Sequence, residues 1–152
     1  MKKHFKDLLK YNEWANYRIL VALEELKTPG DELLSLFSHV LTAQIIWLNR
    51  IKGIPTSPFP LWEQYKLTEL RSMTEETSNN WNNYLDTHAL DTFEEMIFYT
   101  NSGGKKYEST IREIMTHMLN HSSHHRGQIA KAIRNKGVQP PATDYIIYAR
   151  IK

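Results

Sequence analysis

Four long segments of the 152-residue chain carry apolar residues at helical spacing, and breaks containing glycine or proline separate them. In the first segment these positions are Phe5, Leu8, Tyr11, Ala15, Ile19, Ala22 and Leu26, each three or four residues after the last. The breaks contain Pro29-Gly30, Gly53 to Pro60, Gly103-Gly104 and Gly137 to Pro141. Because an amphipathic helix must bury its apolar face, four such segments predict an all-α four-helix bundle, formed by a single domain over residues 1–152.

The breaks place the helices at about residues 5–26, 31–52, 61–87 and 110–136. We expect Asp31 to cap the second helix, and Thr110 with Glu113 to form a capping box at the start of the last. Gly137 is the residue expected to end that helix. Before it, the stretch from Phe93 to Tyr107 predicts a short β-hairpin, because Phe98-Tyr99-Thr100 leads into the turn Asn101-Ser102-Gly103-Gly104. The long connections after the second and third helices leave the order of helix directions open.

The chain contains no cysteine. This absence excludes thiolate zinc fingers, cysteine-ligated iron–sulfur clusters, cysteine nucleophiles and disulfide scaffolds. A chain of this length buries enough apolar surface to fold without a metal or a disulfide. Any metal that it binds is therefore expected to serve function rather than folding.

The charge balance and the absence of long apolar runs exclude several partners. The formal net charge is only +2, which does not point to nucleic acid or membrane lipid. The N-terminal residues 1–7 return to charged side chains too soon for a signal peptide. The longest uncharged stretch, Leu33 to Asn49, includes serine, histidine, threonine and glutamine, which favours a buried helix over a membrane span. We expect a cytoplasmic protein with neither a nucleic-acid partner nor a membrane partner.

Four of the seven histidines lie within nine residues, at positions 117, 121, 124 and 125. Residues four apart share one face of a helix, so His117/His121 and His121/His125 are both pairs that could bind one metal ion. The apolar stripe of this segment contains Ile111, Ile114, Met118, His121, His125, Gln128 and Ala132. It weakly favours the second pair.

His39 is a candidate third ligand, because it lies in line with Leu36, Ala43 and Ile46 on the second predicted helix. Three neutral histidines leave coordination positions for water and substrate, as catalytic metal sites do. The competing interpretation is a hydrogen-bonded core histidine at this position and a histidine pair without metal. His4 and His88 are predicted surface residues. No Glu-x-x-His or His-Glu-x-x-His is present, which excludes di-iron carboxylate bundles and the usual metalloprotease helix.

Three stretches of the chain match motifs of a known family. They are Tyr11-Asn12-Glu13-Trp14-Ala15-Asn16, Ser38-His39-Val40-Leu41 through Trp47-Leu48, and His117 to Ile129 followed by Gly137, Pro140-Pro141 and Asp144-Tyr145. Through them the chain resembles the DinB family (DinB/YfiT-like) of small metalloenzymes, least clearly over Leu61 to Asp91. The resemblance implies a four-helix bundle in up-down-down-up order, usually as a homodimer. It also implies one divalent metal, nickel or zinc in members, held by His39, His121 and His125. Iron or cobalt would also suit three imidazoles.

The resemblance implies a class of chemistry but not a substrate. Relatives include thiol transferases that use bacillithiol, mycothiol or glutathione, and a mycothiol-dependent maleylpyruvate isomerase. We therefore expect a metal-dependent thiol S-transferase, or a related metalloenzyme, that acts on a small molecule with a low-molecular-weight thiol such as bacillithiol. Arg126 is a candidate for orienting an anionic substrate, and no catalytic residue is assigned. The alternative is a non-catalytic metal-binding stress-response or interaction protein. A DNA-associated factor is the least favoured reading.

Overall fold

The computed structural model describes residues 1–26, 28–56, 60–88 and 92–152. Within this part of the chain the fold is mostly helical, with one small antiparallel sheet, as the sequence predicts. The elements are α1 (Lys2–Glu25), α2 (Asp31–Ile51), α3 (Leu67–Thr87), the 3₁₀ turn η1 (Thr92–Glu94), β1 (Met96–Thr100), β2 (Lys106–Thr110), α4 (Ile111–Asn135) and α5 (Tyr145–Ile151). The predicted hairpin is confirmed: β1 pairs antiparallel with β2, with Tyr99 opposite Tyr107.

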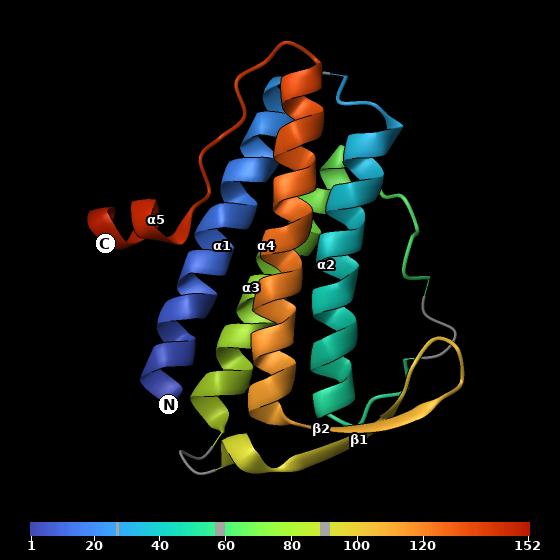
Figure 1. The fold of residues 1–152 in the computed structure, drawn as a ribbon. Coiled ribbons are helices and arrows are strands. Elements are labelled where there is room, and N and C mark those ends of the chain that lie inside the picture. The colour runs from blue at the N-terminus through green and yellow to red at the C-terminus, as the bar shows by residue number, and fades with distance from the viewer. Residues whose placement is uncertain (27, 57–59, 89–91) are drawn as a thin grey trace.

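The four long helices lie side by side, and the hairpin lies across one end of them (Figure 1). An ion pair joins Lys6 to Asp86, and a second joins Arg71 to Glu24, so the start of α1 lies beside the end of α3. These two helices are therefore antiparallel. Figure 1 shows α1 and α4 running in one direction and α2 and α3 in the other.

Two apolar clusters fill the space between the helices. The cluster near the hairpin includes Phe5, Trp81 and Met115, and the cluster at the opposite end includes Phe37 and Ile133. Between them a polar layer crosses the core. In this layer Asn12 donates to Gln44 at 3.2 Å, and Gln44 donates to Ser122 at 2.9 Å. Because buried polar groups must be paired, this chain of hydrogen bonds fixes α1, α2 and α4 lengthwise relative to one another.

The ends of α2 and α4 largely follow the predicted signals. Thr110 and Glu113 form the expected capping box of α4, with Glu113 N–H donating to Thr110 Oγ1 at 3.2 Å. Gly137 follows α4 at φ 77°, a conformation that favours glycine. The predicted cap of α2 is off by one residue, because Gly30 at φ 87° is the cap and Asp31 begins the helix. Among the described residues, no helix combines the length and apolarity needed to cross a membrane.

The third helix begins at Leu67 rather than at Leu61, so the predicted start is wrong by six residues. The backbone N–H of Lys66 donates to the Glu69 carboxylate at 2.7 Å, which fixes the first turn of α3 at this point. The residues before Lys66 therefore remain in the connection from α2, and two of them contact a histidine of the site described below.

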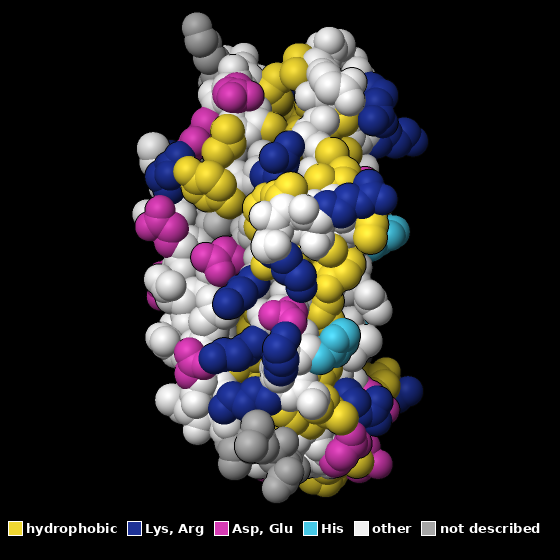
Figure 2. Space-filling view, turned by 90° about the vertical axis from the view of Figure 1, so that its left-hand side faces the viewer, with side chains coloured by type: hydrophobic (Ala, Val, Ile, Leu, Met, Phe, Trp, Pro, Cys, Tyr) yellow, Lys and Arg dark blue, Asp and Glu magenta, His cyan; other side chains and the backbone are white. Residues whose placement is uncertain are grey.

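The short helix α5 has no counterpart in the sequence prediction. Its residues are all at least partly exposed, so they leave no buried stripe in the sequence. Tyr11 holds α5 against α1. Its hydroxyl donates to the Thr143 carbonyl oxygen at 2.8 Å, and its ring centroid lies 5.2 Å from that of Tyr145. Figure 2 views the molecule from the side on which α5 lies in Figure 1, and it shows exposed hydrophobic side chains interspersed with charged ones.

Candidate metal centre

Three histidines from two helices meet at one point between α2 and α4. One nitrogen from each of His39, His121 and His125 lies within 4.8 Å of the others. His39 and His125 are buried and His121 is half-buried. The three residues predicted as ligands are therefore close together, although 82 positions separate His39 from His121. We call this group the histidine triad.

Hydrogen bonds orient two of the three imidazoles. His39 Nδ1 donates to the carbonyl oxygen of Leu61 at 3.1 Å, and His125 Nδ1 donates to Gln128 Oε1 at 2.7 Å. Because each Nδ1 carries the proton, each Nε2 presents a lone pair. Metal-binding histidines are commonly held in this way by a second hydrogen-bonding partner.

The spacing of the nitrogens suits a metal ion. His125 Nε2 lies 3.2 Å from His121 Nε2. Two nitrogens that are each about 2.0–2.1 Å from one tetrahedral ion lie roughly 3.3 Å apart. The three imidazole donors and the spacing of this pair therefore fit a divalent metal of the kind that imidazole binds.

The environment lowers the pKa of two of the three triad histidines, His121 and His39. Burial, and then the nearby His125 and His39, lower the pKa of His121 to about 4. Burial is also the main cause that lowers the pKa of His39 below its ordinary value. Neutral imidazole is the form that binds metal, so protons do not compete for these two ligands near neutral pH.

The connection after α2 covers one side of the triad. The Trp62 ring stacks on the His39 ring, with centroids 3.7 Å apart and planes 4° apart. The same connection supplies the Leu61 carbonyl that orients His39. Trp62 lies within the predicted third helix at residues 61–87, and helical periodicity gave no signal of its contact with His39.

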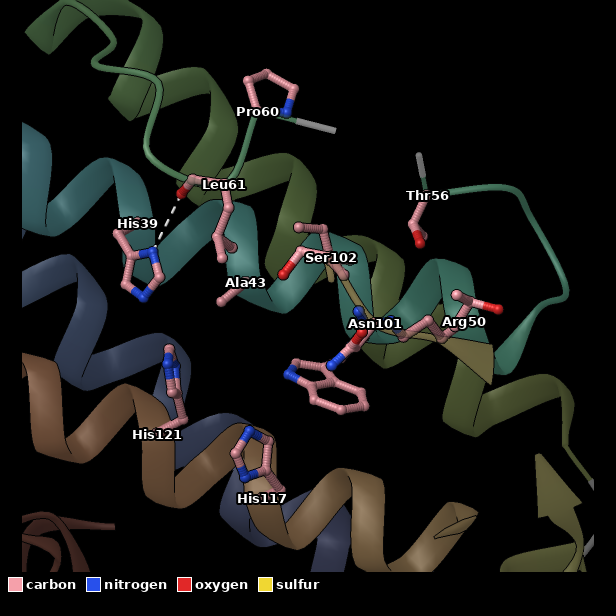
Figure 3. A pocket seen from close by; sticks show the side chains of 13 residues that line it. His39, Ala43, Arg50, Thr56, Pro60, Leu61, Asn101, Ser102, His117 and His121 are labelled. Carbon is pink, nitrogen blue, oxygen red and sulfur yellow. Dashed lines mark hydrogen bonds between the residues drawn. The ribbon is translucent and has the colours of Figure 1, made fainter. Parts of the chain in front are cut away.

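A cavity of about 540 Å³ opens beside the triad (Figure 3). Its lining residues are His39, Ala43, Ile46, Trp47, Arg50, Thr56, Pro60, Leu61, Thr100, Asn101, Ser102, His117 and His121. Two triad histidines are thus part of its wall, and the hairpin supplies another part. Ligand cavities are typically roughly 300–1,000 Å³, so this one suits a small molecule.

Two further histidines of the sequence cluster surround the triad without joining it. His117 lines the cavity, and its ring centroid lies 4.9 Å from that of Trp47. His124 is exposed, and its Nε2 accepts a hydrogen bond from Gln128 Nε2 at 3.2 Å. Gln128 therefore bridges His124 and His125.

The two predicted surface histidines differ from each other. His4 is exposed, as predicted. His88 is only half-exposed, because its ring packs on that of Tyr84 at 3.9 Å. Its Nδ1 donates to the Tyr84 carbonyl oxygen at 3.1 Å. Neither histidine belongs to the triad.

Arg126 does not orient a substrate in this cavity. Its side chain is 1% exposed, and Nη1 donates to Asn12 Oδ1 at 2.7 Å and to Asn16 Oδ1 at 2.8 Å. The guanidinium therefore faces α1 and belongs to the polar layer of the core. The expectation for Arg126 was wrong because adjacency to His125 in sequence places the two side chains about 100° apart around α4.

The arginine that does line the cavity is Arg50, which the sequence analysis did not single out. Its Cζ lies 4.3 Å from the centroid of the Trp47 ring and 4.9 Å from that of Tyr99. Arg50 follows His39 by eleven residues, about three helical turns, so the two share a face of α2. This spacing is the sequence signal that could have identified it.

Similarity to known proteins extends over nearly the whole chain. The family model described as DinB family matches residues 1–152. A curated relative, "Protein DinB" of Bacillus subtilis (strain 168), is 27% identical over 156 residues, which cover 93% of this chain and 91% of the relative. The family match includes both helices that carry the triad.

Proposed function

The chain belongs to the DinB family, and we propose that it is a metal-dependent thiol S-transferase or a related metalloenzyme. The observation that carries this proposal is the convergence of three imidazoles beside a cavity of about 540 Å³. Membership of this family and a histidine group of this kind together fit a metal-binding protein. The adjoining cavity favours an enzyme over a non-catalytic metal-binding protein, because a small molecule can reach the triad.

Within this proposal His39, His121 and His125 hold one divalent metal ion, nickel or zinc first, with iron or cobalt as further candidates. Such an ion, with three protein ligands, supplies Lewis-acid chemistry that lowers the pKa of a bound thiol or water. Leu61 and Gln128 keep His39 and His125 in the required tautomer. The chain has no cysteine, so the sulfur of a thiol reaction must come from a small molecule such as bacillithiol.

We further propose that the four long helices form a four-helix bundle in up-down-down-up order, as one domain over residues 1–152, and that the protein is a homodimer. The ion pairs between α1 and α3 support opposite directions for these helices. The contacts of His39 with His125 and of Trp47 with His117 support opposite directions for α2 and α4. Sedimentation analysis tests the dimer.

Elemental analysis tests the metal site. Protein without a tag, purified without a nickel column, is expected to contain about one divalent metal per chain. The variant His125→Ala is expected to lose it, because two imidazoles seldom hold a metal stably. The matched control is His4→Ala, which removes an exposed histidine outside the triad. Metal content that survives in His125→Ala would contradict the site.

Turnover tests the reaction. The metal-loaded protein is expected to conjugate an electrophile such as monochlorobimane to bacillithiol, and His125→Ala is expected to lose this activity. Absence of turnover with every low-molecular-weight thiol, in protein that does contain metal, would overturn the transferase proposal. That result would favour the alternative, a non-catalytic metal-binding stress-response or interaction protein.

A further inference from the structure

The described residues that line the cavity beside the triad include a positive charge and no negative one. Among the described residues that line it, none is aspartate or glutamate, and Arg50 is the one with a permanent charge. Residues 57–59, which the structure does not describe, are serine, proline and phenylalanine in the sequence and add no carboxylate. The described lining of the cavity therefore presents a positive charge without a compensating negative one.

Arg50 has no anionic partner within the described part of the chain. Arg71 and Arg112 each pair with a glutamate, whereas no ion pair of Arg50 is found there. Its Nε is buried and has no hydrogen-bond partner among the described residues. Burial lowers the pKa of Arg50 below its ordinary value. A partly buried cation without a counter-ion is costly, so an anion in the cavity would be stabilised.

The surroundings hold Arg50 in place and add neutral hydrogen-bonding groups. The rings of Trp47 and Tyr99 lie close to its guanidinium. Thr56, Thr100, Asn101 and Ser102 contribute polar side chains to the same cavity. Asn101 Oδ1 already accepts from the backbone N–H groups of Gly103 at 3.0 Å and Lys105 at 2.9 Å. Its amide NH₂ is therefore the group left to donate to a ligand.

We propose that the cavity binds a small molecule with a carboxylate that pairs with Arg50, while the rest of the molecule extends to the histidine triad. The planar guanidinium matches a carboxylate in shape and charge. This inference rests on the proposed function and specifies its substrate class.

The dimensions of the cavity set a minimum length for this ligand. Trp47, beneath the Arg50 guanidinium, follows His39 by eight residues, which is about 12 Å along α2. Figure 3 shows His39 and His121 on one side of the open space and Arg50, Asn101 and Ser102 on the other. A ligand that contacts both ends must be extended, with its carboxylate remote from the group at the triad.

The test compares two thiols of equal chain length, 6-mercaptohexanoate with a terminal carboxylate and 6-mercaptohexanol with a neutral hydroxyl, by calorimetric titration of the zinc-loaded protein. Wild-type protein is expected to bind the anionic thiol about tenfold more tightly, because hydrogen bonds to charged groups are strong. Arg50→Gln is expected to bind the two equally, and Arg50→Lys to retain part of the preference. Arg18→Gln is the matched control, since exposed Arg18 also lies over a tryptophan ring, at 5.2 Å, but outside the cavity.

Metal-free protein separates this inference from the proposed function. NMR-monitored titration with hexanoate and hexanol measures the same charge preference without sulfur or metal. Equal affinities in wild-type protein, or a preference that survives in Arg50→Gln, would overturn the inference. Displacement of hexanoate by inorganic phosphate at lower concentration than by acetate would overturn the carboxylate assignment. Failure of zinc to bind, with the charge preference intact, would overturn only the proposed function.

Discussion

Gln128 links two histidines and sets the orientation of a triad member. Its Oε1 accepts from His125 Nδ1 at 2.7 Å, so Gln128→Leu removes the partner that fixes the His125 tautomer. We expect the zinc affinity to fall about 10–100-fold, as is typical when such a partner is lost. Gln128→Glu keeps an acceptor oxygen and should bind zinc at least as tightly as wild-type protein. Competition with a chelating dye measures both, and an unchanged affinity in Gln128→Leu would exclude this role.

Arg126 is expected to contribute to stability and not to metal binding. Arg126→Ala leaves the amide oxygens of Asn12 and Asn16 buried without their donor. We expect a loss of about 2–4 kcal/mol in the free energy of unfolding, measured in urea, because buried unpaired polar groups are costly. Lys131→Ala, at an exposed position on α4, is the control. Lost zinc affinity in a variant of unchanged stability would instead connect Arg126 to the site.

The sequence predicted the three histidines of the triad but not the residues that contact them. His121 and His125 are recognisable because both lie on one helix at a spacing of four, and His39 because it interrupts an apolar stripe. The family resemblance chose between the two histidine pairs. Leu61 and Trp62 could not be predicted, because their contact with His39 depends on the path of the connection between α2 and α3. Periodicity gives no information about such a path.

The start of α4 carries a capping box whose contribution can be measured. In Thr110→Ala the N–H of Glu113 loses the hydroxyl that accepts from it at 3.2 Å. We expect the free energy of unfolding to fall by about 1 kcal/mol, the usual cost of losing such a cap. Thr116→Ala is the control, because its hydroxyl bonds only within the exposed face of the same helix. Equal losses in the two variants would argue against the capping role.

The Glu113 half of this capping box predicts that the free energy of unfolding depends on pH. The Glu113 carboxylate accepts from Thr110 N–H at 2.8 Å, and this hydrogen bond is the main cause that lowers the pKa of Glu113 below its ordinary 4.5. Because the folded-state pKa is the lower one, the stabilisation is present above pH 4.5 and is lost as pH falls through the folded value. Glu113→Gln should therefore be less stable than wild-type protein near pH 7, and the difference should shrink in acid. Urea unfolding across this range measures it, and a difference independent of pH would rule out the carboxylate as its source.

The two ends of α4 were predictable from local capping residues, whereas the start of α3 and the existence of α5 were not. Thr110, Glu113 and Gly137 lie at the two ends of α4, and each was assigned from adjacent residues alone. The false start at Leu61 arose because aromatic residues of the connection resemble an apolar helical face. The helix α5 escaped prediction because its tyrosines pack on Tyr11, far away in sequence.

The whole molecule combines a self-sufficient core with a site that joins two helices. Two apolar clusters lie on either side of the polar layer, and both contain residues from all four long helices. The triad connects α2 and α4. We therefore expect folding not to depend on the triad, and a ligand bound there to stabilise the contact between these helices.

Removal of metal is accordingly expected to lower stability without unfolding the protein. A ligand bound only by the folded state adds about 2.7 kcal/mol at a free concentration of 100 times its Kd. Protein treated with a chelator should keep its helical circular dichroism and unfold cooperatively at a lower Tm. Added zinc should restore the Tm of wild-type protein and leave that of His125→Ala unchanged. Loss of the helical signal on chelation would mean that the metal is structural, because a core that is stable by itself would survive its removal.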